Sequence, residues 1–126
     1  MASFPCPCCG YLVFSGPPGT YEICPICGWE NDVSQLRFPT VAGGANEPSL
    51  VFAQKSFLKF GWKEKGVVPK VRDSILKDQI KDPTWRPLEI ADLPAGGDDY
   101  IEGREPYYPA NRTELYYWKE NYWRRK

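Results

Sequence analysis

The residues best suited to chemistry in this 126-residue chain are five cysteines, all within its first 27 positions. Two segments, residues 6–10 and 24–28, repeat the pattern C-P-x-C-G. A C-x-x-C turn directs two sulfurs at one point, while proline restricts φ and glycine lets the chain leave at positive φ. Two such turns, called knuckles here, supply four thiolates, the closed ligand set of a structural zinc site. The ligands predicted from this spacing are Cys6, Cys9, Cys24 and Cys27.

Zinc is the metal expected in this site, with iron as the alternative. The knuckles also resemble those of rubredoxin, where iron occupies an equivalent shell of four sulfurs, but rubredoxin separates its knuckles more widely and is a much shorter chain. Free buried cysteines or disulfides are the other interpretation of the four residues. Cys8 is left outside the set. Three roles stay open for it: an apolar filler, a neighbour or exchange ligand of the metal, and a nucleophile whose pKa the metal lowers.

Composition excludes several functions. The chain has no histidine, which rules out Ser-His-Asp and Cys-His catalytic groups and every metal site that needs imidazole. Its 16 basic and 16 acidic residues give a formal net charge of zero, which argues against a dedicated nucleic-acid coat. No apolar run approaches the roughly 20 residues of a membrane-spanning helix, and the N-terminus has no features of a secretory signal. We therefore expect a cytoplasmic protein with no membrane contact and no enzymatic activity, in which clustered cysteines bind metal.

The elements that must position the knuckles are predicted from the residues around them. Residues 11–14 are typical of a short strand, 16–19 of a tight turn and 21–23 of a returning strand. A hairpin is therefore expected to bring the second knuckle beside the first, which is the arrangement of a zinc ribbon. Trp29 follows the second knuckle and is expected to pack over it as a core residue.

Two helices are predicted downstream. Residues 46–49 combine polar caps with an early proline, apolar residues recur at helical spacing, and Gly61 is a natural stop. A helix is expected over about 48–60, burying Phe57 and Phe60 against the ribbon. A weaker pattern with a solvated, charge-balanced face predicts a second helix over 68–81, which Asp82-Pro83 would end.

Two remaining stretches are candidates for binding a partner. Residues 86–105 are predominantly acidic, and we expect them to contact a basic surface of a partner protein through Asp98, Asp99, Glu102 and Glu105. The C-terminal residues 106–126 are rich in tyrosine and tryptophan and end in basic residues. We predict that residues 115–118 form a strand with one buried face, with a short amphipathic helix from about residue 112 as the other conformation. If exposed, the same rings and charges would form a stacking surface for nucleic acid.

The cysteine pattern and its neighbouring segments resemble the cysteine-rich CPCC family of small bacterial proteins. The resemblance rests on residues 4–11, 21–32 and 42–50 and covers about residues 3–62, beyond which only the Tyr-Tyr-Trp tail is similar in kind. It implies no catalytic activity. It implies a metal-binding cluster at the matching positions Cys6, Cys8, Cys9, Cys24 and Cys27. Small proteins of this kind often occur among bacterial immunity proteins, which neutralise a co-encoded toxin.

Together these observations predict one α+β domain over residues 1–126. A zinc-ribbon or rubredoxin-like knuckle hairpin (1–40) would pack with one or two helices (46–61 and 68–81), and a loop-rich remainder (62–126) would contain the aromatic strand. The predicted function is that of a non-catalytic, zinc-binding protein-interaction module, an immunity protein that neutralises a cognate bacterial toxin. The alternative is a nucleic-acid-binding zinc ribbon that uses the aromatic and basic C-terminus.

Overall fold

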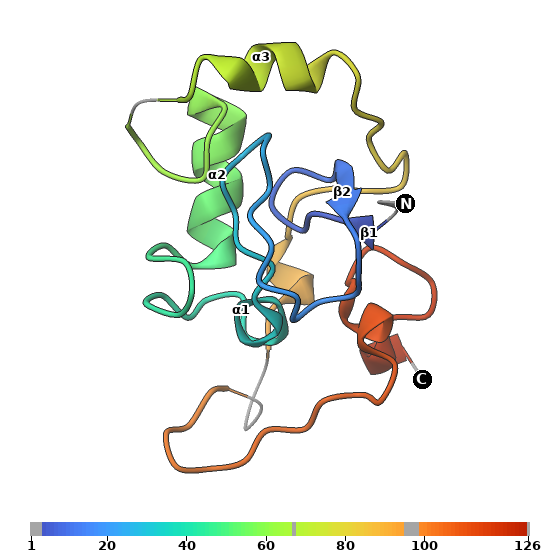
Figure 1. The fold of residues 1–126 in the computed structure, drawn as a ribbon. Coiled ribbons are helices and arrows are strands. Elements are labelled where there is room, and N and C mark those ends of the chain that lie inside the picture. Colours follow the sequence, from blue (N-terminus) through green and yellow to red (C-terminus); the bar gives the residue numbers. More distant parts are fainter. Residues whose placement is uncertain (1–3, 67, 95–98, 126) are drawn as a thin grey trace.

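The computed structural model describes residues 4–66, 68–94 and 99–125. Within these residues, two strands, β1 (Phe4–Pro5) and β2 (Leu12–Phe14), precede three helices, α1 (Val33–Arg37), α2 (Leu50–Phe60) and α3 (Val71–Leu76). Three short 3-10 turns follow, η1 (Ile90–Asp92), η2 (Arg112–Leu115) and η3 (Trp123–Arg125). Figure 1 shows α2 along one side of the N-terminal segment, α3 across the C-terminal end of α2, and the C-terminal turns on the opposite side. The architecture is a small α+β arrangement, as predicted.

The hairpin predicted between the two knuckles is wrong in its pairing. β2 pairs antiparallel with β1, with Phe4 opposite Phe14 and Pro5 opposite Leu12. The expected returning strand does not pair with β2, because Ile23 forms an isolated bridge with Glu30 instead. Each knuckle is therefore the turn of its own small hairpin, one over residues 4–14 and the other over residues 23–30.

Both edges of β2 are occupied by other segments, which explains why residues 21–23 cannot join it. β1 takes one edge, and on the other side Leu12 N–H donates to the Ile80 carbonyl (2.9 Å) while Tyr11 bridges Lys81. Tyr21 lies at a positive φ of 59° and its N–H donates to the Asn31 carbonyl (3.2 Å). The chain between the knuckles consequently turns toward the second hairpin rather than back onto β2.

The helix α1 was not predicted from the sequence. Asp32 is its N-cap, and the carboxylate accepts hydrogen bonds from the N–H groups of Ser34 and Gln35. Satisfying those otherwise unpaired donors stabilises the first turn of the helix. Trp29, just before α1, is completely buried, as the prediction of a core residue required.

The helix predicted over 48–60 is confirmed as α2. Ser49 is its N-cap and accepts from Phe52 N–H, while Gly61 ends it at a positive φ of 81°. The inward face carries Leu50, Ala53, Gln54 and Ser56, all buried. The expectation that Phe60 faces the ribbon is wrong, because this ring is 46% exposed. Phe57 is partly buried and packs against the core.

The second predicted helix is present but much shorter than 68–81. It is α3, which ends at Leu76 and has no buried residue. The expected stop at Asp82-Pro83 is wrong because residues 80–82 run beside the first hairpin, where Asp82 N–H donates to the Gly10 carbonyl (2.8 Å). Backbone groups used in this pairing are unavailable to a helix.

The C-terminal aromatic strand predicted over residues 115–118 does not form. Residues 112–115 are the 3-10 turn η2, and four consecutive side chains after Glu114 are buried: Leu115, Tyr116, Tyr117 and Trp118. A strand with one buried face would expose every second residue. The chain turns here instead, so that all four side chains enter the core from one short segment. Within the described part of the chain, no helix is long and apolar enough to cross a membrane.

Candidate metal centre

Each knuckle closes through the same pair of backbone hydrogen bonds. In the first, Cys6 N–H donates to the Tyr11 carbonyl (2.9 Å) and Gly10 N–H donates to the Cys6 carbonyl (2.7 Å). The equivalent bonds of the second knuckle, both 2.8 Å, run from Cys24 N–H to the Trp29 carbonyl and from Gly28 N–H to the Cys24 carbonyl. The repeat in the sequence is therefore also a repeat of backbone shape.

A tryptophan ring covers the glycine of each knuckle. Gly10 and Gly28 have φ of 84° and 86°, a region that side chains with a Cβ rarely adopt. A Cβ on Gly10 would lie 2.6 Å from the ring of Trp85, and a Cβ on Gly28 would lie 2.5 Å from the ring of Trp62. Glycine is thus required at both positions for two reasons: the backbone has a positive φ, and the tryptophan ring leaves no room for a Cβ.

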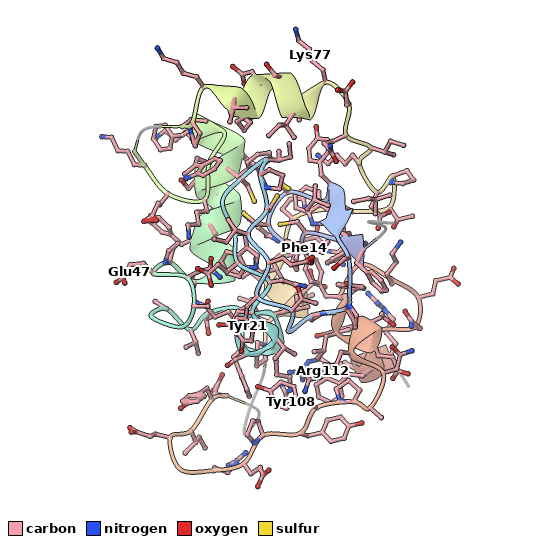
Figure 2. The ribbon with its side chains drawn as sticks, viewed as in Figure 1. Phe14, Tyr21, Glu47, Lys77, Tyr108 and Arg112 are labelled. Atoms are coloured by element: carbon pink, nitrogen blue, oxygen red, sulfur yellow. The ribbon has the colours of Figure 1, made fainter. Side chains whose placement is uncertain are left out.

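The two knuckles bring four sulfurs together between α2 and the β1–β2 hairpin (Figure 2). The Sγ atoms of Cys6, Cys9, Cys24 and Cys27 all lie within 4.8 Å of one another, and these four side chains are completely buried. Two of the separations join one knuckle to the other: Cys6 to Cys27 at 3.5 Å and Cys9 to Cys24 at 3.7 Å. The cysteines are free thiols, because these distances far exceed the ~2.05 Å of a disulfide bond.

The sulfur geometry matches a tetrahedral metal site. A Zn–S bond of ~2.3 Å implies Sγ–Sγ edges of about 3.8 Å in a tetrahedron. The two separations between the knuckles lie close to this value. The four cysteines predicted from the spacing are therefore the ones that the fold gathers, and they are placed to bind one metal ion.

Burial and mutual contact change the acidity of these thiols. Burial raises the pKa of Cys6, Cys9 and Cys27. Burial acts in the same direction on Cys24, but hydrogen bonds from the Cys27, Cys6 and Cys9 thiols outweigh it, so the pKa of Cys24 is lowered. These contacts therefore favour the charged form at Cys24 and the neutral form at the other three cysteines. A cation at the centre of the cluster would lower the pKa of these thiols, because it stabilises the charged form of every ligand.

Residues from distant parts of the chain hold the knuckles in place. The Pro7 carbonyl in the first turn accepts two hydrogen bonds, from Gln54 Nε2 on α2 and from Trp85 Nε1, both at 2.9 Å. In the second turn the Cys27 carbonyl accepts from Lys63 N–H (2.8 Å). The turns are thus fixed from outside as well as through their own backbone bonds.

Cys8 lies at the third position of the first knuckle, where the second knuckle has Ile26. Both side chains are completely buried, and both belong to the hydrophobic core. Cys8 is not a member of the group of four sulfurs. Its thiol nevertheless contacts that of Cys27, and this contact raises the pKa of Cys27, so Cys8 is a buried neighbour of the cluster as well as a core side chain.

The acidic residues predicted to bind a partner lie apart from the metal centre. Asp98 lies outside the described residues, and Asp99, Glu102 and Glu105 are exposed. Asp99 and Glu105 line a hollow of about 220 Å³ together with Arg37 and Arg104, whereas Glu102 does not line it. The structure thus brings two of the four predicted residues to one surface feature.

The basic C-terminal tail packs on aromatic rings of its own chain. The guanidinium of Arg124 lies 4.5 Å from the centre of the Trp123 ring, and that of Arg125 lies 5.3 Å from the Tyr122 ring. Arg125 also donates to the carbonyls of Lys119 (2.6 Å) and Tyr117 (2.9 Å). Both arginines thus contact groups of their own chain. Most of the rings that nucleic-acid stacking would need are buried.

Sequence reasoning missed three residues that support the site: Gln54, Trp62 and Trp85. Gln54 lies on α2 among residues read only for their apolar spacing, and the two tryptophans lie in segments without a periodic pattern. The sequence signal that could have predicted the two tryptophans lies in the knuckles themselves. A glycine at positive φ leaves one side of the turn open, and a buried turn then needs a large flat side chain to cover it.

Comparison with known proteins agrees with the cysteine pattern. No curated protein matches the sequence. The family model described as "Cysteine-rich CPCC" matches residues 4–78, which include both knuckles, α1, α2 and α3. This match covers more than half of the chain, so the protein belongs to the cysteine-rich CPCC family.

Proposed function

We propose that the chain is a non-catalytic zinc protein in which the metal stabilises the fold, and that the folded protein acts by binding a partner protein. The observation that carries the first part is the burial of all four sulfurs, which leaves no solvent-facing ligand position. Catalytic zinc keeps an open position for water or substrate, whereas structural zinc has four protein ligands. A four-sulfur tetrahedral set is typical of zinc, with iron as the alternative occupant.

Bound zinc would offset half of the charge of the four thiolates and join the two hairpins at the centre of the molecule. The two strands have two and three residues, and α1 and α3 have five and six, so regular secondary structure contributes little stability. Structural zinc supplies about 10–16 kcal/mol of apparent binding free energy in small peptides at neutral pH, much of it as folding energy. A chain of this size with few regular elements gains greatly from such a site.

Metal analysis of the purified chain tests the structural zinc. We expect about one zinc and no iron per chain. Chelation should abolish the near-ultraviolet circular dichroism of the buried tryptophans. A chain that keeps its tertiary spectrum without metal, or that contains iron, would contradict this part of the proposal.

The second part of the proposal is supported by how the acidic segment is held. The ring of Tyr100 packs edge-on against Phe38 (5.7 Å between ring centres), and Arg37 Nε donates to the Tyr107 carbonyl (2.8 Å). Residues 99–107 are therefore tied to the end of α1 at two points, while their carboxylates face solvent. An ordered acidic surface lowers the entropic cost of binding a basic partner. The partner class we propose is a cognate bacterial toxin.

Affinity capture from the native host tests this interaction. We expect the intact chain to retain one partner protein and the triple variant Asp99→Asn, Glu102→Gln, Glu105→Gln to lose it. The matched control neutralises carboxylates elsewhere, with Asp78→Asn and Glu120→Gln, and should retain the partner. Equal capture by both variants would contradict the acidic surface, and the absence of any captured protein would contradict the interaction.

A further inference from the structure

The outward face of α2 carries exposed aromatic rings. Phe52 is 57% exposed and Phe60 is 46% exposed, and Phe60 follows Phe52 by two steps of four residues, so both lie on one side of the helix. The outward face of a surface helix normally carries polar side chains, with its apolar stripe turned to the core. Two large rings together on such a face mark a contact surface.

A basic groove lies between the two rings. Its volume is about 260 Å³, and its lining consists of two phenylalanines, three lysines and one serine: Phe52, Phe60, Lys55, Lys59, Lys65 and Ser56. None of the three lysines forms an ion pair with a carboxylate among the described residues. Ser56 is buried in this groove, and its hydroxyl has no hydrogen-bond partner within the same residues.

A second groove of opposite charge adjoins the first at the N-terminal end of α2. Its volume is about 340 Å³; Phe52 lines this groove as well, and its charged lining is Glu47 and Glu64. Glu47 points outward beside the N-terminal end of the helix (Figure 2). The face is therefore acidic on one side of Phe52 and basic on the other.

We propose that this face binds a second copy of the chain, with the two α2 helices antiparallel and the two-fold axis near Phe52. A two-fold interface places the same patch on both subunits, so each half of the patch must complement the other half. Rotation about Phe52 brings the acidic groove of one subunit onto the basic groove of its partner. The two Phe52 rings then meet at the centre, where burial contributes most to binding. A partner carrying a single sign of charge would complement only one half of this face.

The association should be weak and sensitive to salt. α2 has 11 residues and is therefore about 16 Å long, which limits the buried area. An interface at the small end of the usual range gives a dissociation constant on the order of 10 µM. The proposal goes beyond the proposed function and requires only the folded chain.

Analytical ultracentrifugation of the full chain as purified tests the proposal, at loading concentrations from about 5 to about 500 µM. The metal content is measured in parallel, so that loss of zinc and loss of association are distinguished. We expect the weight-average mass to rise from that of a monomer to that of a dimer. Phe52→Ser, which changes an exposed side chain, should weaken dimerisation by about tenfold or more.

Two charge reversals and their mixture provide the decisive comparison. Lys55→Glu with Lys59→Glu makes the face predominantly acidic and leaves Lys65 as the one lysine of the basic groove, and Glu47→Lys with Glu64→Lys makes the face basic. Each double variant should be monomeric by itself, because like charges would then meet across the axis. An equimolar mixture of the two should recover a dimer. The matched control, Lys70→Glu with Lys77→Glu, reverses exposed charges at α3 and should leave the dimer unchanged; Lys77 points away from α2 (Figure 2).

The outcomes that overturn the proposal follow from the same measurements. If the chain stays monomeric at every concentration, this face does not bind a second copy and the proposal is wrong. A dimer that survives both reversals would have its interface elsewhere. Failure of the mixture of correctly folded variants to associate would exclude the two-fold arrangement. Far-ultraviolet circular dichroism of each variant establishes that it is folded.

Discussion

Cys8 and Ile26 occupy equivalent positions in the two knuckles, yet one has a thiol and the other an aliphatic side chain. Both are completely buried in the core. The knuckle turn therefore accommodates a buried side chain of moderate size at this point, with or without a sulfur. The four predicted ligands differ from Cys8 because their sulfurs all lie within 4.8 Å of one another.

Matched alanine substitutions separate the filler from a ligand. Cys8→Ala should keep about one zinc per chain and cost about 1 kcal/mol of unfolding free energy, because only a small buried side chain is lost. Cys24→Ala removes the same atoms but opens the metal shell, so the chain should lose its zinc and its tertiary structure. Zinc content and circular dichroism measure both effects. Loss of zinc from Cys8→Ala would instead make Cys8 a ligand or an exchange ligand.

The thiol pKa values predict how zinc binding depends on pH. In the folded chain burial raises the pKa of Cys6, Cys9 and Cys27, whereas contacts with the other thiols lower the pKa of Cys24. In the unfolded, metal-free chain all four thiols have ordinary pKa values of about 8.5 and hold their protons at pH 7. Zinc must displace these protons, so about four are released per metal ion when binding and folding are coupled. Affinity should therefore fall as pH falls, by about a factor of ten per released proton for each pH unit.

Calorimetric titration of zinc into the metal-free chain, repeated in buffers of different ionisation enthalpy, counts the released protons. Release of about three protons would mean that the metal-free chain keeps a folded cluster in which Cys24 is already a thiolate. An affinity independent of pH between 6 and 8 would contradict binding by thiols that are protonated in the metal-free chain.

At the scale of the elements, the two knuckles share one local turn, and each turn is covered by a tryptophan ring from a different, distant part of the chain. Trp85 covers Gly10 after the first cysteine pair, and Trp62 covers Gly28 after the second. The turns need only local residues for their backbone shape. Their burial depends on two tryptophans that come from separate stretches of the chain.

A pair of glycine substitutions tests the aromatic cover. Gly103 also lies at a positive φ of 83°, but a Cβ there would have no neighbour within 4 Å. Gly103→Ala should cost only the backbone strain of a left-handed residue, about 1–2 kcal/mol. Gly28→Ala adds a clash with the Trp62 ring and should cost about 1–3 kcal/mol more. Urea unfolding of the metal-loaded proteins measures the difference, and equal losses would show that Trp62 moves aside freely.

The elements that were predictable from the sequence are those whose signals are local. The C-P-x-C-G repeats fix the metal ligands, and the cap residue Ser49 with Gly61 fixes both ends of α2. The partner of β2 was not predictable, because β1 has only two residues and includes a proline. The aromatic residues 115–118 have the composition of a strand, but their fold is decided by packing against residues 30 or more positions away.

At the scale of the whole molecule, the C-terminal segment is tied to the segment that covers the first knuckle. Asp82 accepts hydrogen bonds from Lys119 and from Trp118 Nε1 (3.1 Å). Burial opposes the charge of this carboxylate, but the hydrogen bonds from Lys119, Thr84 and Trp118 outweigh it and lower its pKa to about 2. The ion pair therefore persists throughout the neutral range, and it joins the end of the chain to residues beside the metal centre.

Tyr117 makes the most direct link between the C-terminus and the first knuckle. Its hydroxyl donates to the Arg86 carbonyl (2.6 Å) and accepts from Gln54 Nε2 (2.8 Å), and Gln54 Nε2 also donates to the Pro7 carbonyl. Tyr117→Phe keeps the buried ring but removes both bonds. Loss of a buried hydrogen-bonding group costs about 1–2 kcal/mol, because its former partners stay buried without it.

The cost should appear as faster release of zinc. Weaker support at Pro7 makes local opening of the first knuckle about 5- to 30-fold more frequent, and a chelator in solution captures the metal from the open form. The rate of transfer to a coloured chelator measures this directly. Tyr100→Phe is the matched control, because Tyr100 is 47% exposed and its hydroxyl forms no hydrogen bond within the described residues. Equal transfer rates for the two variants would mean that the C-terminal segment only covers the metal centre, whereas faster transfer from Tyr117→Phe alone would show that it controls access to the metal.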